Sequence, residues 1–378
     1  MNQMLELNAH GQSCWMDDLT RGMITNGELE QRVADGLRGI TSNPTIFEKA
    51  IVTGDDYDRD IARAVAEGRS IPKIYDELIT TDVRHACDIL RPIYDQSGGT
   101  DGFVSLEVSP HLSHATQASI DEARRLSALV NRPNVLIKIP GTVAGVPAIE
   151  QLLFEGININ ITLLFSIASY EAVAEGYLRA LERRVLAGRS IDGVTSVASF
   201  FLSRIDALVD QLLRQRIVPN GSTRGEPDPK RLLGKAAIAN AKLAYQRFRR
   251  ILESDRWNAL AGKGAQVQRM LWASTSTKNP AYHDLMYVEP LVGPLTVNTM
   301  PQRTIAALLD HGVIDTTLEE RIEEAHVVMA NLDRVGVRFE QVTAQLEHEG
   351  IQKFIDPFDS LMNRLAAKRR EHVRGSSP

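Results

Sequence analysis

Cysteine is the scarcest residue in this sequence, with Cys14 and Cys87 the two among 378 residues. Two cysteines are too few for a disulfide framework, and their spacing matches no zinc-binding motif. We expect Cys14 to pack as a small buried hydrophobic residue. The chain must therefore be stabilised by a core, for which its length is ample.

Long hydrophobic runs and an excess of basic residues are also absent. No stretch approaches the roughly 18 apolar residues that a membrane span requires. The first residues, MNQMLELNAHGQSCW, lack the basic and apolar regions of a secretory signal. The formal net charge is −5, so no basic face indicates nucleic acid. We expect a cytoplasmic protein without nucleic-acid or membrane partners.

What the sequence does contain is an alternation of short apolar segments with helical periodicity. Its composition, 43% hydrophobic and 24% charged, is that of a globular protein, and we find no internal repeat. The candidate strands are 14–19, 39–43, 104–109, 135–140, 157–165, 195–203, 269–275 and 293–300. Eight strands alternating with helices favour an α/β fold of the (β/α)₈ TIM-barrel type. A doubly wound open sheet is the alternative, which is disfavoured because no G-x-G-x-x-G follows the first strand.

The chain is over a hundred residues longer than a minimal barrel of about 250. We expect one barrel domain over residues 1–378, although two domains are also allowed. The excess falls in additional helices, predicted as insertions at about 53–100 and 204–268 and as an extension at about 313–371. Residues 219–229 are dense in turn formers and predict an exposed loop. The basic run 368–374 is typical of a solvated helix end.

Lys138 is the most informative residue, because it interrupts the apolar strand 135–140 (VLIKIP). A buried ammonium is unfavourable by several kcal/mol unless it is paired or has a chemical role. A structural ion pair, or a side chain that reaches water at a strand edge, is the simpler interpretation. Two other strands carry possible partners, Glu107 in 104–109 and Asp17 in 14–19.

The strand 157–165 strengthens the prediction of a polar site, because Asn158, Asn160 and Thr162 have the same parity and should share one face. Active sites of barrels lie at the carboxyl ends of the strands. The residues expected around this mouth are Asp17, Asn43, Glu107, Lys138, Asn160, Thr162, Ser199 and Arg204.

Residues 273–280 (ASTSTKNP) predict an anion site at the end of the seventh strand. Small residues let backbone N–H groups approach an anion, and loops after strands 7 and 8 are the usual phosphate site of this fold. A helix cap rich in serine and threonine is the alternative. Arg204 offers a second cation.

Eight segments of the chain together resemble the signature blocks of the transaldolase family. They are 16–19 (MDDL), 39–45 (GITSNPT), 105–110 (SLEVSP), 135–140 (VLIKIP), 160–166 (NITLLFS), 198–206 (ASFFLSRID), 272–278 (WASTSTK) and 296–301 (TVNTMP). The blocks occur in the family's order and span about 13–312, and the overall length resembles the longer bacterial branch. One departure is Ala115-Thr116, where the family commonly has an acidic residue before the threonine; we place it in the following helix.

The resemblance implies a Schiff-base mechanism in a (β/α)₈ barrel without metal or organic cofactor. Lys138 would attack the C2 ketone of a sugar-phosphate substrate, and Glu107 would shuttle protons through a water held by Thr162. Asp17 would take the C4 hydroxyl proton. By the same resemblance Asn43, Asn160 and Ser199 would hold hydroxyls, and Arg204, Ser274 and Lys278 would hold the phosphate.

Three functions remain compatible with the sequence. The first is a transaldolase of the pentose phosphate pathway, acting as a monomer or homodimer. The second is a related enzyme for another sugar phosphate in specialised metabolism, or a fructose 6-phosphate aldolase. The small aldolases of the superfamily carry an amide in place of Glu107 and a tyrosine in place of Phe201, which disfavours the aldolase. The third is a regulator or scaffold without activity, which the intact Lys138, Glu107 and Asp17 disfavour.

Overall fold

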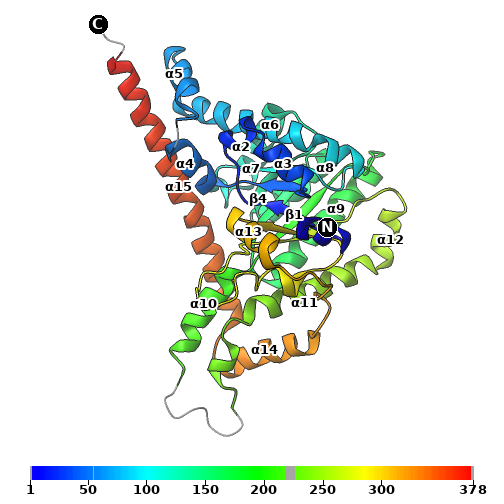
Figure 1. Cartoon of the computed structure of the whole chain (residues 1–378). Helices are drawn as coiled ribbons and strands as arrows, with labels where there is room; N and C mark the ends of the chain where they lie inside the picture. The colour runs from blue at the N-terminus through cyan, green and yellow to red at the C-terminus, as the bar shows by residue number, and fades with distance from the viewer. Residues whose placement is uncertain (1, 54, 218–225, 376–378) are drawn as a thin grey trace.

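Eight parallel strands form a closed barrel in the computed structural model, which describes residues 2–53, 55–217 and 226–375 (Figure 1). Each strand pairs with its sequence neighbours, and β8 pairs with β1 to close the barrel. The strands are β1 (Gln12–Met16), β2 (Gly39–Thr41), β3 (Phe103–Glu107), β4 (Val135–Pro140), β5 (Ile159–Leu164), β6 (Ser196–Phe201), β7 (Arg269–Ala273) and β8 (Thr296–Met300). The predicted (β/α)₈ barrel is confirmed, and the open-sheet alternative is wrong.

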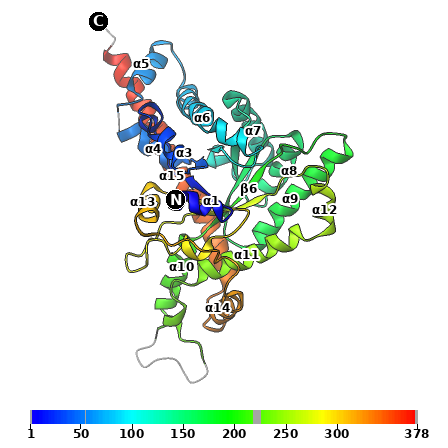
Figure 2. The same ribbon diagram turned by 45° about the vertical axis from the view of Figure 1, so that its right-hand side comes forward.

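Helices surround the barrel and also occupy the long connections (Figures 1 and 2). Those before β6 are α1 (Gln3–Ala9), α2 (Arg21–Thr25), α3 (Glu28–Ala34), α4 (Pro44–Thr53), α5 (Asp58–Ala66), α6 (Ile71–Gln96), α7 (Thr116–Val130), α8 (Gly145–Glu155) and α9 (Ile167–Leu186). Those after β6 are α10 (Ser203–Arg214), α11 (Ala236–Leu252), α12 (Asp255–Ala261), α13 (Gln302–His311), α14 (Ile322–Arg334) and α15 (Phe339–Gly375). Short 3₁₀ turns are η1 (Pro110–Leu112), η2 (Pro229–Leu232) and η3 (Glu289–Leu291). Most of the predicted 219–229 loop lies outside the described residues.

Several predicted strands extend too far at their carboxyl ends. β1 ends at Met16 rather than residue 19, and β7 ends at Ala273 rather than residue 275. The apolar pattern predicts strands that are too long, because residues beyond the last hydrogen bond between strands are still buried, as Leu19 is. Asp17 and Ser274 therefore lie just past their strands, at the rim.

Asn158, the first polar residue of the fifth predicted strand, lies outside β5. It precedes β5, where its Oδ1 accepts a hydrogen bond from the Thr195 backbone N–H at 2.9 Å. Its Nδ2 donates to the Pro133 carbonyl at 3.2 Å. The residue thus ties strand connections together at the amino end of the barrel, and the predicted strand begins two residues too early.

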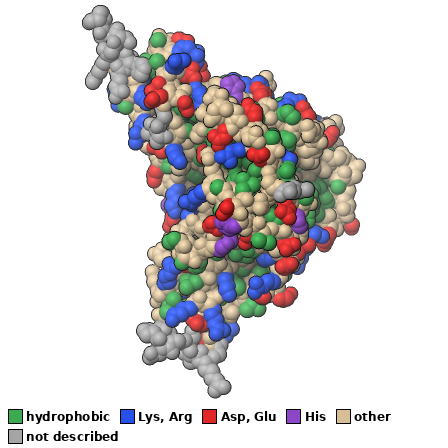
Figure 3. Space-filling view, viewed as in Figure 1, with side chains coloured by type: hydrophobic (Ala, Val, Ile, Leu, Met, Phe, Trp, Pro, Cys, Tyr) green, Lys and Arg blue, Asp and Glu red, His purple; other side chains and the backbone are tan. Residues whose placement is uncertain are grey.

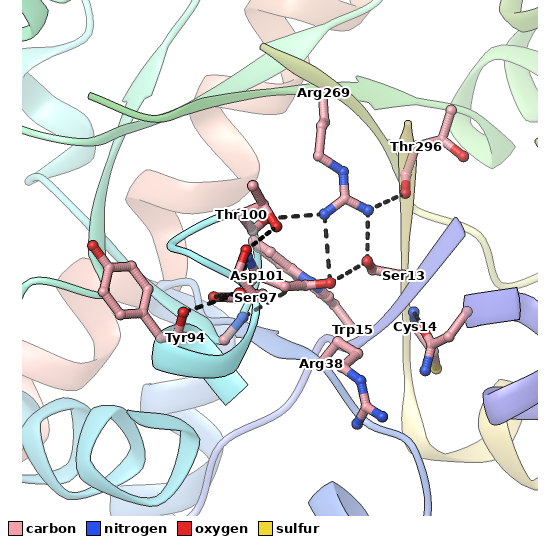
Figure 4. A network of polar contacts seen from close by, with 12 residues as sticks. Ser13, Cys14, Trp15, Arg38, Tyr94, Ser97, Thr100, Asp101, Arg269 and Thr296 are labelled. Atoms are coloured by element: carbon pink, nitrogen blue, oxygen red, sulfur yellow. Dashed lines mark hydrogen bonds and ion pairs between the residues drawn. The ribbon is translucent and has the colours of Figure 1, made fainter. Parts of the chain in front are cut away.

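A polar network closes the amino end of the barrel, around Asp101 (Figure 4). The Asp101 carboxylate accepts hydrogen bonds from the Trp15 indole N–H at 2.8 Å and from the Ser13 hydroxyl. Arg269, at the start of β7, pairs with the same carboxylate at 3.5 Å. A Cβ on Gly39 would lie 2.4 Å from the Trp15 ring, so this β2 position requires glycine. This end of the barrel is built for stability.

The longest helix, α15, runs along one side of the molecule and contacts α4, α5, α6, α10 and β5 (Figures 1 and 2). It approaches β5 at a bulge, where Leu163 has a left-handed φ of 61° and the pairing with β6 shifts. A Cβ on Gly350 would lie 3.0 Å from the Leu163 side chain, so the helix meets the bulge at a glycine. Near its end, Lys368 of the basic run forms an ion pair with Asp58 of α5.

Two smaller expectations are also answered by the structure. Cys14 is fully buried, as predicted, and burial raises the pKa of its thiol to about 12. Within the described ranges, every helix is too short or too polar to span a lipid bilayer.

Candidate active site

A cavity of about 720 Å³ opens at the carboxyl end of the barrel. Nine of the eleven residues predicted for the site line it, namely Asp17, Asn43, Lys138, Thr162, Ser199, Phe201, Arg204, Ser274 and Lys278. The other two lie beneath this layer, Glu107 in contact with Lys138 and Asn160 in contact with Ser199. The structure therefore brings together all the residues that the sequence placed at one mouth.

Lys138 projects from the middle of β4 into the base of the cavity. Its Nζ donates to the Ser42 carbonyl at 2.9 Å and to Glu107 Oε2 at 3.2 Å, and both charged side chains are almost fully buried. The barrel register explains the contact, because Lys138 pairs with Glu107 on β3 and with Asn160 on β5. A primary amine in this setting is shielded from bulk water and has one acid within proton-transfer distance.

Glu107 is held in a way that favours its protonated form. Burial raises the pKa of this carboxyl, and the Lys138 ammonium only partly opposes the effect. Glu107 Oε1 and Thr162 Oγ1 are buried and have no hydrogen-bond partner among the described residues. Both atoms can therefore accept a partner that enters the site.

Asp17 lies directly after β1, across the cavity from this pair. Its Oδ1 accepts a hydrogen bond from the Thr41 hydroxyl at 2.8 Å, and Thr41 in turn contacts Thr299 at 2.7 Å. Removal from bulk water raises the pKa of Asp17, with the Lys138 charge as the main opposing effect. The hydroxyl chain fixes the carboxylate so that one oxygen remains available to the cavity.

Amide and hydroxyl groups form a chain behind Lys138. Asn160 donates from Nδ2 to the Ser105 hydroxyl at 2.9 Å, and its Oδ1 accepts from the Ser199 hydroxyl at 2.6 Å. On the other side, Asn43 Oδ1 accepts from the Ile46 backbone N–H at 3.1 Å, at the start of α4. These bonds hold the polar groups in fixed orientations at the cavity wall.

Two cations that face the cavity have no carboxylate partner among the residues that the structure describes. Arg204, in the first turn of α10, has a buried Nη1 that finds no acceptor among the described residues, and burial lowers the pKa of its guanidinium. Burial and the nearby Arg303 and Arg204 charges lower the pKa of Lys278, whose Nζ donates to the Ser276 hydroxyl at 2.9 Å. Ser274 has a left-handed φ of 55° and places its hydroxyl 2.9 Å from that of Ser203. This arrangement suits an anion.

The wall supplied by α15 is the part that sequence reasoning missed. Its side chains in the cavity are Gln345, Leu346, Glu349, Lys353 and Phe354. The Phe354 ring centroid lies 5.7 Å from Lys138 Nζ and 5.8 Å from the Arg204 guanidinium carbon. No signal in the sequence separates these residues from the rest of an amphipathic helix, because covering a pocket and packing on a barrel require the same apolar periodicity.

A (β/α)₈ barrel with a buried lysine and a buried acid at its carboxyl end has the arrangement expected of an enzyme that uses an amine nucleophile. The chain matches the family described as Transaldolase/Fructose-6-phosphate aldolase over residues 14–365, and it belongs to that family. "Transaldolase 2" of a Nostoc species is 50% identical over 373 residues, which cover 97% of this chain and 98% of that protein. "Transaldolase" of Thiobacillus denitrificans is 44% identical over 366 residues, covering 97% and 100%. The resemblance found in the sequence is thereby confirmed.

Proposed function

We propose that the protein is a transaldolase of the non-oxidative pentose phosphate pathway. It transfers a dihydroxyacetone unit from sedoheptulose 7-phosphate or fructose 6-phosphate to glyceraldehyde 3-phosphate or erythrose 4-phosphate. The observation that carries the proposal is the contact of Lys138 with Glu107 at the base of a cavity that also holds Asp17 and two cations. The names and near-complete coverage of the relatives support it.

The first step is formation of a Schiff base. Transfer of a proton from Lys138 to Glu107 gives a neutral amine and a neutral acid, and the raised pKa of the buried Glu107 carboxyl favours this transfer. The amine adds to the C2 carbonyl, and Glu107 then protonates the departing hydroxyl, so that water leaves and an iminium ion remains. The orphaned Glu107 Oε1 and Thr162 Oγ1 support a water between them that relays these protons.

Cleavage follows at the C3–C4 bond. Asp17 takes the proton of the C4 hydroxyl, C4 becomes the aldehyde carbon of the leaving aldose phosphate, and the bonding electrons pass to the iminium to give an enamine on Lys138. In the second half, C3 of the enamine attacks an acceptor aldehyde, and Asp17 returns its proton to the new hydroxyl. Hydrolysis of the iminium then frees Lys138.

The remaining polar groups position the substrate. Asn43, Asn160 and Ser199 bind the hydroxyls of the dihydroxyacetone unit, and Arg204, Ser274 and Lys278 bind the phosphate. The unpartnered Arg204 Nη1 supports this assignment, because a phosphate oxygen would supply its missing acceptor. The presence of Phe201 and Glu107, where the small aldolases carry a tyrosine and an amide, supports a transferase over an aldolase, as the resemblance implies.

The test is trapping of the intermediate with borohydride during incubation with fructose 6-phosphate, followed by peptide mass mapping. We expect one reduced adduct on Lys138 and none in Lys138→Ala. Lys353→Ala, in which a second cavity lysine is lost, is the matched control and should still be trapped. An adduct on another lysine, or none in the parent protein, would overturn the mechanism.

We infer further that the enzyme acts in the cytoplasm as a monomer or homodimer, and that residues 1–378 form one barrel domain. A single apolar cluster that extends from Met4 to Leu365 supports the single domain. Multi-angle light scattering would measure the oligomeric state. Two separate thermal transitions in calorimetry would contradict a single domain.

A further inference from the structure

A cluster of histidine and carboxylate side chains lies on the surface beside α13, away from the residues that line the active-site cavity. His283 and Asp284 belong to the loop between β7 and β8, and His311 is the last residue of α13. One ligand atom from each of the three lies within 4.8 Å of the others. Histidine side chains are visible beside acidic ones on this face of the molecule (Figure 3).

The two imidazole rings are nearly perpendicular, with an interplanar angle of 80°, and both present Nε2 to one carboxylate. Nε2 of His311 lies 3.1 Å from Asp284 Oδ1, and Nε2 of His283 lies 3.9 Å from the same oxygen. The opposite ring nitrogens face two further carboxylates. Nδ1 of His311 is 3.1 Å from Asp310 Oδ2, and Nδ1 of His283 is 3.8 Å from Glu289 Oε2.

We propose that His283, Asp284 and His311 bind a Zn²⁺ ion, with water as a fourth ligand. Two imidazoles and a carboxylate are ligands that zinc accepts, whereas Mg²⁺ and Ca²⁺ prefer oxygen alone. Bonds of about 2.0–2.2 Å in a tetrahedron bring ligand atoms to roughly 3.3 Å from each other. The three side chains are between 41% and 55% exposed, so small rotations close the present spacing to that distance.

The outer carboxylates complete the features of a metal site. Zinc-bound histidines commonly donate their second ring N–H to a carboxylate, which fixes the tautomer and makes the other nitrogen more basic. Asp310 holds that position for His311 at 3.1 Å, whereas Glu289 lies 3.8 Å from His283 Nδ1, at ion-pair rather than hydrogen-bond distance. In the described part of the chain, Asp284, Asp310 and Glu289 form ion pairs with these two histidines and with no lysine or arginine. Three negative charges are therefore left for a cation.

The bound ion has a structural consequence for the loop. The loop from β7 begins with Ser274, Ser276 and Lys278 in the cavity and continues through His283 to η3. Zinc would join this loop to the end of α13 by a short cross-link between residues 283 and 311. The site is thus a stabilising clamp and takes no part in the chemistry at Lys138.

Titration of the full-length protein with ZnCl₂ by calorimetry tests the proposal. We expect one saturable site per chain, a rise in melting temperature with zinc, and a visible spectrum of tetrahedral type when Co²⁺ replaces zinc. His283→Asn, Asp284→Asn and His311→Asn should each lose the site. Asp310→Asn, outside the ligand set, should weaken binding by roughly 10-fold or more.

His111→Asn is the matched control, because His111 is an exposed imidazole paired with a single carboxylate, Asp359, at 2.8 Å. It should bind zinc like the parent protein. The proposal is overturned if the parent shows no saturable site, or if the three ligand variants bind as tightly as His111→Asn. The ligands are exposed, so circular dichroism of the variants should match that of the parent.

Discussion

Charged groups of the active site are held so that their charged forms are disfavoured. Burial raises the pKa of Asp17 and Glu107 and lowers the pKa of Arg204 and Lys278. The two carboxyl groups of the free enzyme can therefore take up and release protons readily. The two cations have no carboxylate partner among the described residues. A phosphate dianion would supply the charge that the two cations lack.

Phosphate recognition can be tested at single residues. Arg204→Ala or Lys278→Ala should raise KM for fructose 6-phosphate much more than for free fructose, because the lost contact exists only when phosphate is present. Steady-state kinetics with both sugars measures the difference. Lys353→Ala should change KM less, since the Lys353 ammonium already pairs with Glu349 at 3.2 Å. Equal losses for both sugars would place the anion elsewhere.

Asp206 gives a pH dependence of stability. Burial raises its pKa from 3.8 to about 7, against hydrogen bonds from the Ala237 backbone N–H and the Tyr287 hydroxyl. Between these two pH values the folded state binds more protons than the unfolded state, so stability falls as pH rises through this range. From pH 5 to 8, the parent should lose roughly 2–3 kcal/mol relative to Asp206→Asn. Urea unfolding of both proteins at pH 5 and pH 8 measures this loss of stability. If the stability of the parent and of Asp206→Asn changed equally with pH, the raised pKa of Asp206 would be refuted.

Among the helices, α15 offers a direct test, because its Phe354 ring faces Lys138 and Arg204. Phe354→Leu keeps an apolar cover but removes the ring that faces Lys138 and Arg204. A cation–π contact of about 0.5–1 kcal/mol predicts a loss in kcat/KM of about 2- to 5-fold. Phe358→Leu is the control, because Phe358 packs on Tyr75 at 5.4 Å and does not line the cavity. Equal activity of both variants would exclude a role for the ring.

The first turn of α7 offers a test of helix capping. Ala115 was expected inside this helix but is its N-cap, with an extended backbone and no side-chain hydrogen bond. In Ala115→Asp, the new carboxylate should accept a hydrogen bond from a backbone N–H in the first turn of α7. This bond should stabilise the fold by about 0.5–2 kcal/mol. Thermal unfolding reports the gain. Ala115→Leu, which cannot cap, should show none.

Strands and their polar residues were predictable because a barrel imposes local rules. Alternating burial identified Lys138, Glu107 and Asn160, and parallel order placed their ends at one rim. The carboxyl ends of strands were placed too late, because buried residues such as Leu19 continue past the hydrogen-bonded ladder. Phe354 could not be predicted, since its place over Lys138 depends on where α15 crosses the barrel, and only tertiary packing decides that.

At the scale of the whole molecule, the reaction itself separates a transferase from an aldolase. With Phe201 and Glu107 in place, fructose 6-phosphate alone should give little dihydroxyacetone, and erythrose 4-phosphate should restore rapid turnover. Phe201→Tyr adds a hydroxyl that can protonate the enamine, so free dihydroxyacetone should increase. A coupled assay with and without acceptor measures both. Rapid acceptor-independent release by the parent would identify an aldolase.

The order of synthesis gives the position of α15 a further meaning. Protein chains emerge from the ribosome amino end first, and all eight strands precede Phe339, where α15 begins. All the strands are therefore synthesised before the first residue of α15. The ring of Phe354 can lie beside Lys138 only after residue 354 has been synthesised. A chain that stops between β8 and α15 would contain every strand of the barrel but would lack the α15 side chains that line the cavity.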